Sequence, residues 1–285
     1  MSKKTRLQYD IIIIGGGLSG LYMAYYAKQK NPDINILILE TKNRIGGRIK
    51  TIKDIPNVVF EAGAARIAKI HTNILHLLDK LKLSHKLEEL ESYNQNKTHN
   101  TDTQITNILE KSKKKSKMFR VNNSFKTAGK ILSKNVEEII NQNGYNTNME
   151  HQSLENYIHY YHNISNNNRY YKLKGGLIKI CSELVKKIGQ KNIIMNCTLN
   201  DFEYDNNCFE LHTTCKNIKT IYYSTKLILA IPKASLLNIP ALHSINNFIP
   251  KIKSVHETKY IRIYAQYPVI RNKVWFHDVP SRITT

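Results

Sequence analysis

The 285-residue sequence predicts an α/β fold built on a doubly wound parallel sheet, and two apolar runs near its start carry that prediction. The first run, YDIIII at 9–14, ends abruptly in glycine, and a helical pattern over 18–30 separates it from the second, INILILE at 34–40. Strand, helix and strand in this order form one βαβ unit, which favours a parallel sheet with helical crossovers.

The composition is typical of a globular protein. Hydrophobic residues make up 41% of the chain and charged residues 23%, which favours a sizeable buried core over a disordered or fibrous chain. The apolar runs stop short of the roughly 20 residues that a membrane-spanning helix needs. The basic N-terminus leads into isoleucines and glycines rather than into a signal-type segment with a cleavage site. We therefore expect no membrane span and a cytoplasmic or otherwise intracellular location.

The cysteines and histidines form no pattern that is typical of a metal site. The four cysteines, Cys181, Cys197, Cys208 and Cys215, make no C-x-x-C pair, and the eleven histidines make no H-E-x-x-H motif. We predict free thiols in a reducing compartment and no bound metal.

The chain is strongly basic, with 43 lysines and arginines against 22 aspartates and glutamates and a formal net charge of +21. Such an excess attracts polyanions, although lysine is abundant throughout and much of the excess is typical of a solvated surface. The densest basic run is EKSKKKSKMFR at 110–120. A block of like charges favours a mobile, solvated loop, and the alternative interpretation is a weak polyanion contact through Lys111–Arg120.

The later elements follow from periodicity and turn residues. Apolar residues at helical spacing predict a helix over 72–83, and the polar stretch 93–170 favours an inserted, mostly helical segment. A further helical pattern within 172–189 ends at Gly189, a typical helix terminator. Strand patterns follow, the first two of them separated by the turn YDNN, at 192–199, 208–214, 225–232 and 259–268.

Gly15, Gly17 and Gly20 form the pattern G-x-G-x-x-G between the first strand and its helix, and Glu40 ends the next strand. This context is typical of a Rossmann-like dinucleotide site. Gly15 permits a tight turn, Gly17 lets the backbone approach a pyrophosphate, and Gly20 lets helix and strand pack closely. The phosphates would lie at the helix N-terminus, and Glu40 would accept hydrogen bonds from a ribose. NAD and FAD both fit this pattern.

Four further segments distinguish between these cofactors: ETKNRIGGRIKT (40–51), FEAGAARI (60–67), KGGLIKI (174–180) and LILAIP (227–232). With them the sequence resembles the flavin-containing amine oxidase family, that of the monoamine oxidases and L-amino-acid oxidases, whose members carry E-x-x-x-R-x-G-G-R after the second strand. The resemblance covers the N-terminal two thirds of a family chain and is weak over 93–170. The composition, rich in Asn, Lys and Ile, is also similar to that of amine-oxidase-like proteins of amoebal giant viruses.

The resemblance implies a Rossmann-like FAD/NAD(P)-binding sheet with FAD as its cofactor. The glycine turn would contact the pyrophosphate, and Glu40 with its two neighbours would bind the adenosine ribose. Arg48 would approach the pyrophosphate and ribityl chain, the loop 63–66 would line the flavin, and Thr198 would hold the adenine. The implied cofactor residues are Gly15, Gly17, Leu18, Ser19, Gly20, Glu40, Thr41, Lys42, Gly47, Arg48, Gly63, Ala64, Ala65, Arg66 and Thr198.

The family's chemistry is hydride transfer from an amine C–H to flavin N5, with O2 as final acceptor and an imine and hydrogen peroxide as products. The resemblance therefore implies an oxidoreductase that acts on a small amine or amino acid, with Arg66 as a candidate to grip a substrate carboxylate. Many members place a catalytic lysine on a substrate-domain strand, and its position falls on Arg262 here, with Lys259 as the alternative. Arginine keeps the charge but does not deprotonate.

The resemblance also divides the chain into segments. Residues 1–70 and 171–236 would build the FAD domain, 71–170 an inserted helical part of the substrate domain, and 237–285 the start of its sheet. The family's third FAD segment has no counterpart here, so we expect a C-terminally incomplete domain whose turnover depends on how much of the site is present. The alternatives are a truncated, non-catalytic FAD-binding or structural relative, and a flavin desaturase or protoporphyrinogen-oxidase-like enzyme.

Overall fold

The structure is a computed structural model that describes residues 8–54, 58–90, 99–133, 135–143, 150–165, 169–255 and 257. It divides into two compact units. The sheet unit comprises Met1–Leu90 with Tyr170–His256, and the helical unit comprises Glu91–Arg169 with Glu257–Thr285. The functional boundaries between an FAD domain and a substrate domain stay predictions.

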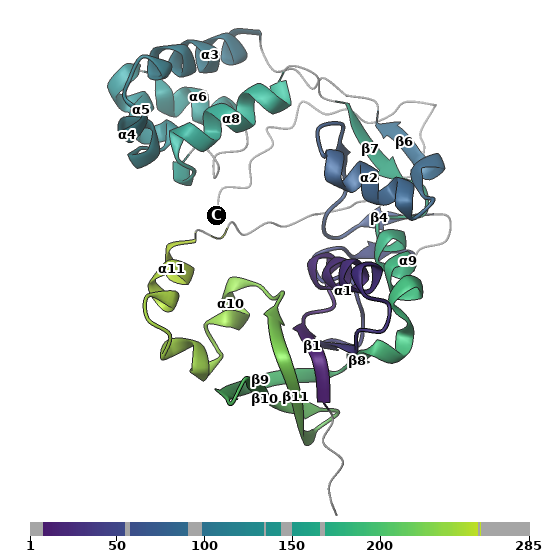
Figure 1. The fold of residues 1–285 in the computed structure, drawn as a ribbon. Helices are drawn as coiled ribbons and strands as arrows, with labels where there is room; N and C mark the ends of the chain where they lie inside the picture. The colour runs from purple at the N-terminus through teal and green to yellow at the C-terminus, as the bar shows by residue number, and fades with distance from the viewer. Residues whose placement is uncertain are drawn as a thin grey trace, which may run out of the picture. The chain divides into compact units, whose positions relative to one another are not determined.

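In spatial order, the main sheet of the sheet unit has six strands among the described residues: β8 (Ile193–Met195), β2 (Ile36–Glu40), β1 (Gln8–Ile14), β11 (Ile218–Leu229), β10 (Cys208–Cys215) and β9 (Cys197–Asp205). β1 pairs in parallel with β2 on one side and with β11 on the other, and β2 pairs in parallel with β8. β9, β10 and β11 form an antiparallel meander. The α/β class and the Rossmann-like βαβ unit are thus confirmed (Figure 1).

Both faces of the central strands are buried, which explains their unbroken isoleucine and leucine runs. Ile13 of β1 faces a core formed with helix α1 (Leu18–Lys30) and helix α9 (Ile178–Ile188), which lie side by side in Figure 1. Its neighbour Ile12 points to the opposite face and packs in a core with residues of the meander. Helices therefore cover one face of β1 and β2, and the meander covers the other.

Several local predictions are confirmed by helix ends and turns. Helix α9 ends before Gly189, whose φ of 91° is a conformation that glycine adopts readily. Asn206 and Asn207 have φ values of 48° and 59° and form the predicted turn between β9 and β10. The helix predicted over 72–83 is α2 (Thr72–Lys80), and Leu77 and Leu78 are its buried residues.

Shorter elements complete the sheet unit. Their bounds are β3 (Thr51–Ile52), β4 (Phe60–Glu61), β5 (Ile67–Ala68), η1 (Ser84–Lys86), β6 (Leu87–Leu90), β7 (Tyr170–Leu173), η2 (Gln190–Asn192), α10 (Lys233–Leu236), η3 (Pro240–His243) and α11 (Phe248–Ser254). β3 pairs with β4, and β7 lies between β5 and β6 in a separate small sheet. These pairings connect the loops that follow β2 to the segment that precedes α9.

The helical unit agrees with the predicted helical insert. Its helices are α3 (His99–Lys113), α4 (Lys117–Asn122), α5 (Phe125–Leu132), α6 (Val136–Asn143) and α8 (Leu154–Ser165). Ile105, Phe125 and Leu154 are fully buried in their common core. Helical spacing of apolar residues therefore dominates this unit despite its many polar side chains.

The expectation of a mobile loop at 110–120 is wrong. Helix α3 continues to Lys113, and α4 begins at Lys117 after Ser116, whose hydroxyl accepts a hydrogen bond from the N–H of Phe119 (3.1 Å). Lysine is a good helix former, and solvent screens the repulsion between exposed lysines, so the like charges do not prevent helix formation.

The prediction of four free thiols is wrong for two cysteines. Cys197 and Cys215 form a disulfide with a Cα–Cα distance of 3.9 Å, because they are register partners at the ends of β9 and β10. Cys181 and Cys208 are free thiols, and burial raises the pKa of Cys181 to about 11, which keeps it protonated and unreactive near neutral pH.

Two features that the sequence analysis expects to be absent are a membrane-spanning helix and a metal site, and both concern the described part of the chain. None of its helices is both long and apolar enough to cross a membrane. The same residues contain no group of three or more His, Cys, Asp or Glu side chains placed to hold a metal ion. The strand predicted at 259–268 lies outside the described residues.

We expect Gly20→Ala to lower the free energy of unfolding by about 1–3 kcal/mol, because its Cβ would collide with the backbone carbonyl of Gly15. Replacing an unstrained helical glycine by alanine instead raises the free energy of unfolding by about 0.5–1 kcal/mol. The sign of the change therefore distinguishes close packing at Gly20 from an unstrained position. Urea titration monitored by circular dichroism would measure the change, and a stabilised variant would contradict the close packing of α1 on β1.

Candidate functional site

The glycine turn follows β1 at the point where that strand has β2 on one side and β11 on the other. β1 pairs in parallel with both neighbours, and in open sheets of this kind ligands usually bind beyond the carboxyl ends of the parallel strands. Gly15 has a φ of 110°, and a Cβ on it would lie 2.6 Å from the carbonyl oxygen of Ala230. Only glycine fits this turn without displacing the end of β11.

The N-terminus of α1 follows the glycine turn directly and has no side-chain cap from the described residues. Its N-cap residue is Gly17, with φ −77° and ψ 176°. Leu18 is half-buried and Ser19 is exposed. The backbone N–H groups of the first turn have no intrahelical partners, so they and the helix dipole favour an anion at this position.

Glu40 ends β2 beside the turn and is only 8% exposed. Its Oε2 accepts a hydrogen bond from the N–H of Gly16 (2.7 Å), and its Oε1 accepts one from the N–H of Lys42 (2.9 Å). These bonds stabilise a buried carboxylate that would otherwise be costly. Thr41 and Lys42 are exposed next to it. The sequence analysis assigned no role to Gly16, although the run of three glycines in which it is the middle residue was the available signal.

A second glycine-rich loop packs against the first. The N–H of Gly46 donates to the carbonyl of Gly16 (2.8 Å), and Gly46 forms a parallel bridge with Gly17. A Cβ on Gly47, which has a φ of 55°, would lie 3.2 Å from the Cα of Gly17. The predicted Gly17 and Gly47 are therefore brought together through direct backbone contact.

Arg44 holds the second loop in shape. Its guanidinium donates to the carbonyls of Ile45 (3.2 Å), Gly47 (3.0 Å) and Ile49 (3.4 Å). Sequence reasoning assigned a ligand role to Arg48 and none to Arg44, although both arginines belong to the RIGGR pattern. The Arg44 side chain binds backbone carbonyls of its own loop, whereas the Arg48 side chain is exposed.

The third loop, 62–66, is joined to the second by backbone hydrogen bonds. The N–H of Ala62 donates to the carbonyl of Lys50 (2.8 Å), and that of Ala64 donates to the carbonyl of Arg48 (3.1 Å). Gly63 faces the Arg48 carbonyl so closely that a Cβ would collide with it. Ala65, also predicted to contact the cofactor, is half-buried in the same loop.

Two further predicted residues lie within the described part of the chain. The guanidinium of Arg66 lies 5.3 Å from the ring centroid of Tyr170, which is a cation–π contact. Thr198 is half-buried on β9, and the N–H of Asn196 donates to the carbonyl of Lys42 (3.1 Å). That bond brings the start of β9 to the segment that follows Glu40.

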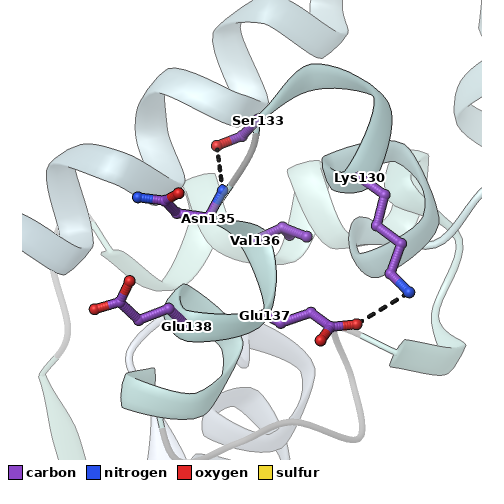
Figure 2. Close-up of a pocket in the computed structure, with 6 residues that line it drawn as sticks. All are labelled: Lys130, Ser133, Asn135, Val136, Glu137 and Glu138. Carbon is purple, nitrogen blue, oxygen red and sulfur yellow. Dashed lines mark hydrogen bonds and ion pairs between the residues drawn. The ribbon is translucent and has the colours of Figure 1, made fainter.

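Arg262 and Lys259, the two candidates for the catalytic cation, lie outside the described residues. A hollow in the helical unit is lined by Lys130, Ser133, Asn135, Val136, Glu137 and Glu138 (Figure 2). Its charged groups already pair, since Lys130 lies 3.0 Å from Glu137, and both side chains are exposed. It contains no arrangement that resembles the glycine-loop site.

Comparison with known proteins gives one family model and several relatives. Residues 13–81 match the family of NAD(P)-binding Rossmann-like domains. A flavin-containing monoamine oxidase A of Dictyostelium discoideum is 37% identical over 73 residues, which cover 26% of this chain and 15% of that protein. The flavin-containing amine oxidase A of Bos taurus is 33% identical over 75 residues, which cover 26% and 14%. About a quarter of the chain is therefore similar to part of the flavin-containing amine oxidases. Protein R188 of Acanthamoeba polyphaga mimivirus is 34% identical over 79 residues, which cover 27% and 16%.

Solved structures share the fold over a longer part of the chain. Putrescine oxidase superposes with a TM-score of 0.64 at 18% identity, over 82% of this chain and 60% of that one. Cyclohexylamine oxidase from Brevibacterium oxydans gives 0.63 at 16% identity, over 81% and 59%. The chain thus spans less than two thirds of the relatives and neighbours it matches.

We expect Gly17→Ala to weaken ADP binding at least about tenfold, since the Cβ would occupy the space before the first turn of α1. The backbone of Gly17 suits alanine, and the nearest other atom would lie 3.8 Å away. The free energy of unfolding should change by less than about 1 kcal/mol. Calorimetric titration with ADP measures the affinity, and urea unfolding measures the stability. Unchanged ADP affinity would contradict this placement of the phosphates.

Proposed function

We propose that the sheet unit binds FAD and that the protein is an oxidoreductase of the amine oxidase type. One observation carries the proposal: two glycine-rich loops meet at the N-terminus of α1, beside the buried carboxylate of Glu40. The match of residues 13–81 to NAD(P)-binding Rossmann-like domains supports a dinucleotide, and the similarity to flavin-containing amine oxidases supports FAD.

The residues present fit the adenosine and pyrophosphate half of FAD. Glycine at 17 leaves room for a phosphate, and the N–H groups of Leu18 and Ser19 could donate to its oxygens. Each carboxylate oxygen of Glu40 accepts one described backbone N–H and retains acceptor capacity for a ribose hydroxyl. Thr198 would contact the adenine from the start of β9.

The loop 62–66 and Arg48 would hold the flavin half. When bound, FAD would supply the hydride acceptor for an amine C–H, with O2 as the final acceptor and an imine and hydrogen peroxide as products. Arg66, which is exposed beside the ring of Tyr170, would bind a substrate carboxylate through the paired N–H donors of its guanidinium. Arg262, or alternatively Lys259, would supply the cation near the reacting atoms.

We expect the purified protein to bind FAD stoichiometrically and Gly17→Ala to bind it at least about tenfold more weakly. Calorimetry and the visible flavin spectrum would measure binding after reconstitution. Anaerobic bleaching of the flavin by a panel of amines and amino acids, with peroxide release in air, would then test the reaction.

Each result separates this proposal from its rivals. Failure of the intact chain to bind FAD would overturn it. Bound flavin that no amine bleaches would favour a truncated, non-catalytic relative. Bleaching by a porphyrinogen or a polyene instead would favour a protoporphyrinogen-oxidase-like enzyme or a desaturase. An intracellular location and a viral source stay predictions.

We also propose that the basic segment 110–120 contacts polyanions. The guanidinium of Arg120 donates to the carbonyls of Lys113 and Lys115 and pairs with Glu155, so the turn between α3 and α4 has a defined shape. Lys114, Lys115 and Lys117 are exposed on it. Phosphate or sulfate groups at similar spacing would replace the repulsion among these lysines with attraction.

We expect replacement of Lys114, Lys115 and Lys117 by glutamate to lower the salt concentration at which heparin releases the protein. The matched control replaces Lys216, Lys219 and Lys226, which are exposed on the meander of the sheet unit, and changes the net charge equally. Equal losses in both variants would show that only the overall charge matters and would contradict a specific contact.

A further inference from the structure

A side-chain clamp fastens the loop 62–66 to the beginning of α9, and neither the glycine motif nor the predicted cofactor residues include it. Thr51 and Glu61 are register partners in the short β3–β4 pair. The hydroxyl of Thr51 lies 3.0 and 2.9 Å from the two carboxylate oxygens of Glu61, to which it donates. Glu61 Oε1 also accepts the N–H of Leu177 (2.6 Å), and Thr51 Oγ1 accepts the N–H of Ile178 (3.2 Å).

The beginning of α9 requires such partners. The first N–H groups of a helix have no intrahelical acceptors, and the N-cap residue of α9 is Leu177, whose side chain cannot supply one. The acceptors come instead from residues 116 and 127 positions away in the sequence. A negative carboxylate at this end also interacts favourably with the helix dipole.

Gly176 makes the clamp sterically feasible. It has a φ of 93°, and a Cβ on it would lie 2.5 Å from Thr51 Oγ1. The glycine thus allows the threonine hydroxyl to reach the N–H of Ile178 at the start of α9. The GG pair of KGGLIKI is explained here by a backbone conformation and a close contact, without any ligand.

The clamp lies next to the loop that the proposed function places at the flavin. Glu61 directly precedes Ala62, whose N–H is bonded to Lys50, one residue before Thr51. The loop is therefore fixed at its start by the clamp and at Ala64 by the Arg48 carbonyl. α9 is packed in the core that also contains α1, so the clamp connects the loop to a firmly packed helix.

We propose that Thr51 and Glu61 are positioning residues, which hold the loop 62–66 in the conformation that receives the flavin ring. The inference rests on the proposed FAD binding. ADP fills only the half of the site formed by the glycine turn and Glu40. Loss of the clamp should therefore weaken FAD binding selectively and leave ADP binding unchanged.

The test uses the whole chain and a set of threonine variants. Thr51→Val keeps the shape but removes the hydroxyl, so we expect the Kd for FAD to rise about tenfold with the Kd for ADP unchanged. The visible spectrum of the remaining bound flavin should shift as well. Thr51→Ser keeps a hydroxyl at this position and should retain the wild-type Kd for FAD and the wild-type flavin spectrum. The matched control is Thr213→Val, which removes a hydroxyl bond to the Thr220 carbonyl (2.7 Å) within the meander and should leave the ratio of the two Kd values unchanged.

Amide hydrogen exchange provides a second measurement that needs no flavin. We expect faster exchange in Thr51→Val for peptides over 61–68 and 176–180, with unchanged exchange in the meander. Wild-type FAD affinity in Thr51→Val, or equal weakening of FAD and ADP, would overturn the clamp and leave the proposed function standing. Failure of the wild type to bind FAD would overturn the proposed function, and unchanged exchange at both peptides would then overturn the clamp independently.

Discussion

The buried carboxylate of Glu40 is the contact on which the arrangement of the site depends. A charge that is 8% exposed needs partners, and two backbone N–H groups provide them. One of these N–H groups belongs to Gly16, where a Cβ would lie only 3.1 Å from the Cβ of Glu40. The end of β2 is therefore tied to the turn that follows β1.

Close backbone contacts extend this arrangement away from β1. Gly47 meets the Cα of Gly17, Gly63 meets the carbonyl of Arg48, and Gly176 meets the hydroxyl of Thr51. Each glycine lies where two segments distant in sequence approach each other more closely than a side chain would allow. The glycine turn, the second glycine loop and the loop 62–66 are thereby connected to one another and to the start of α9. The relation to flavin-containing amine oxidases is consistent with such a scaffold.

Much of the sheet unit could be predicted because its signals are local. The isoleucine run, the helix after it and Glu40 depend on periodicity and spacing within 40 residues. Arg44 was missed because two arginines flank the same glycine pair, and only folding shows which of them turns toward the backbone. The Cys197–Cys215 pair was missed because strand register, not linear spacing, brings the sulfurs together.

The sequence by itself determined the α/β class, the glycine turn and the acidic residue beside it, since each follows from a backbone conformation or a period that neighbouring residues specify. Only the tertiary structure decided which loops meet that turn, because backbone hydrogen bonds between separate loops, such as that from Gly46 to Gly16, form only on folding. The role of Thr51 and Glu61 belongs to the second kind: an unremarkable threonine and glutamate gain a function only where a helix begins beside them.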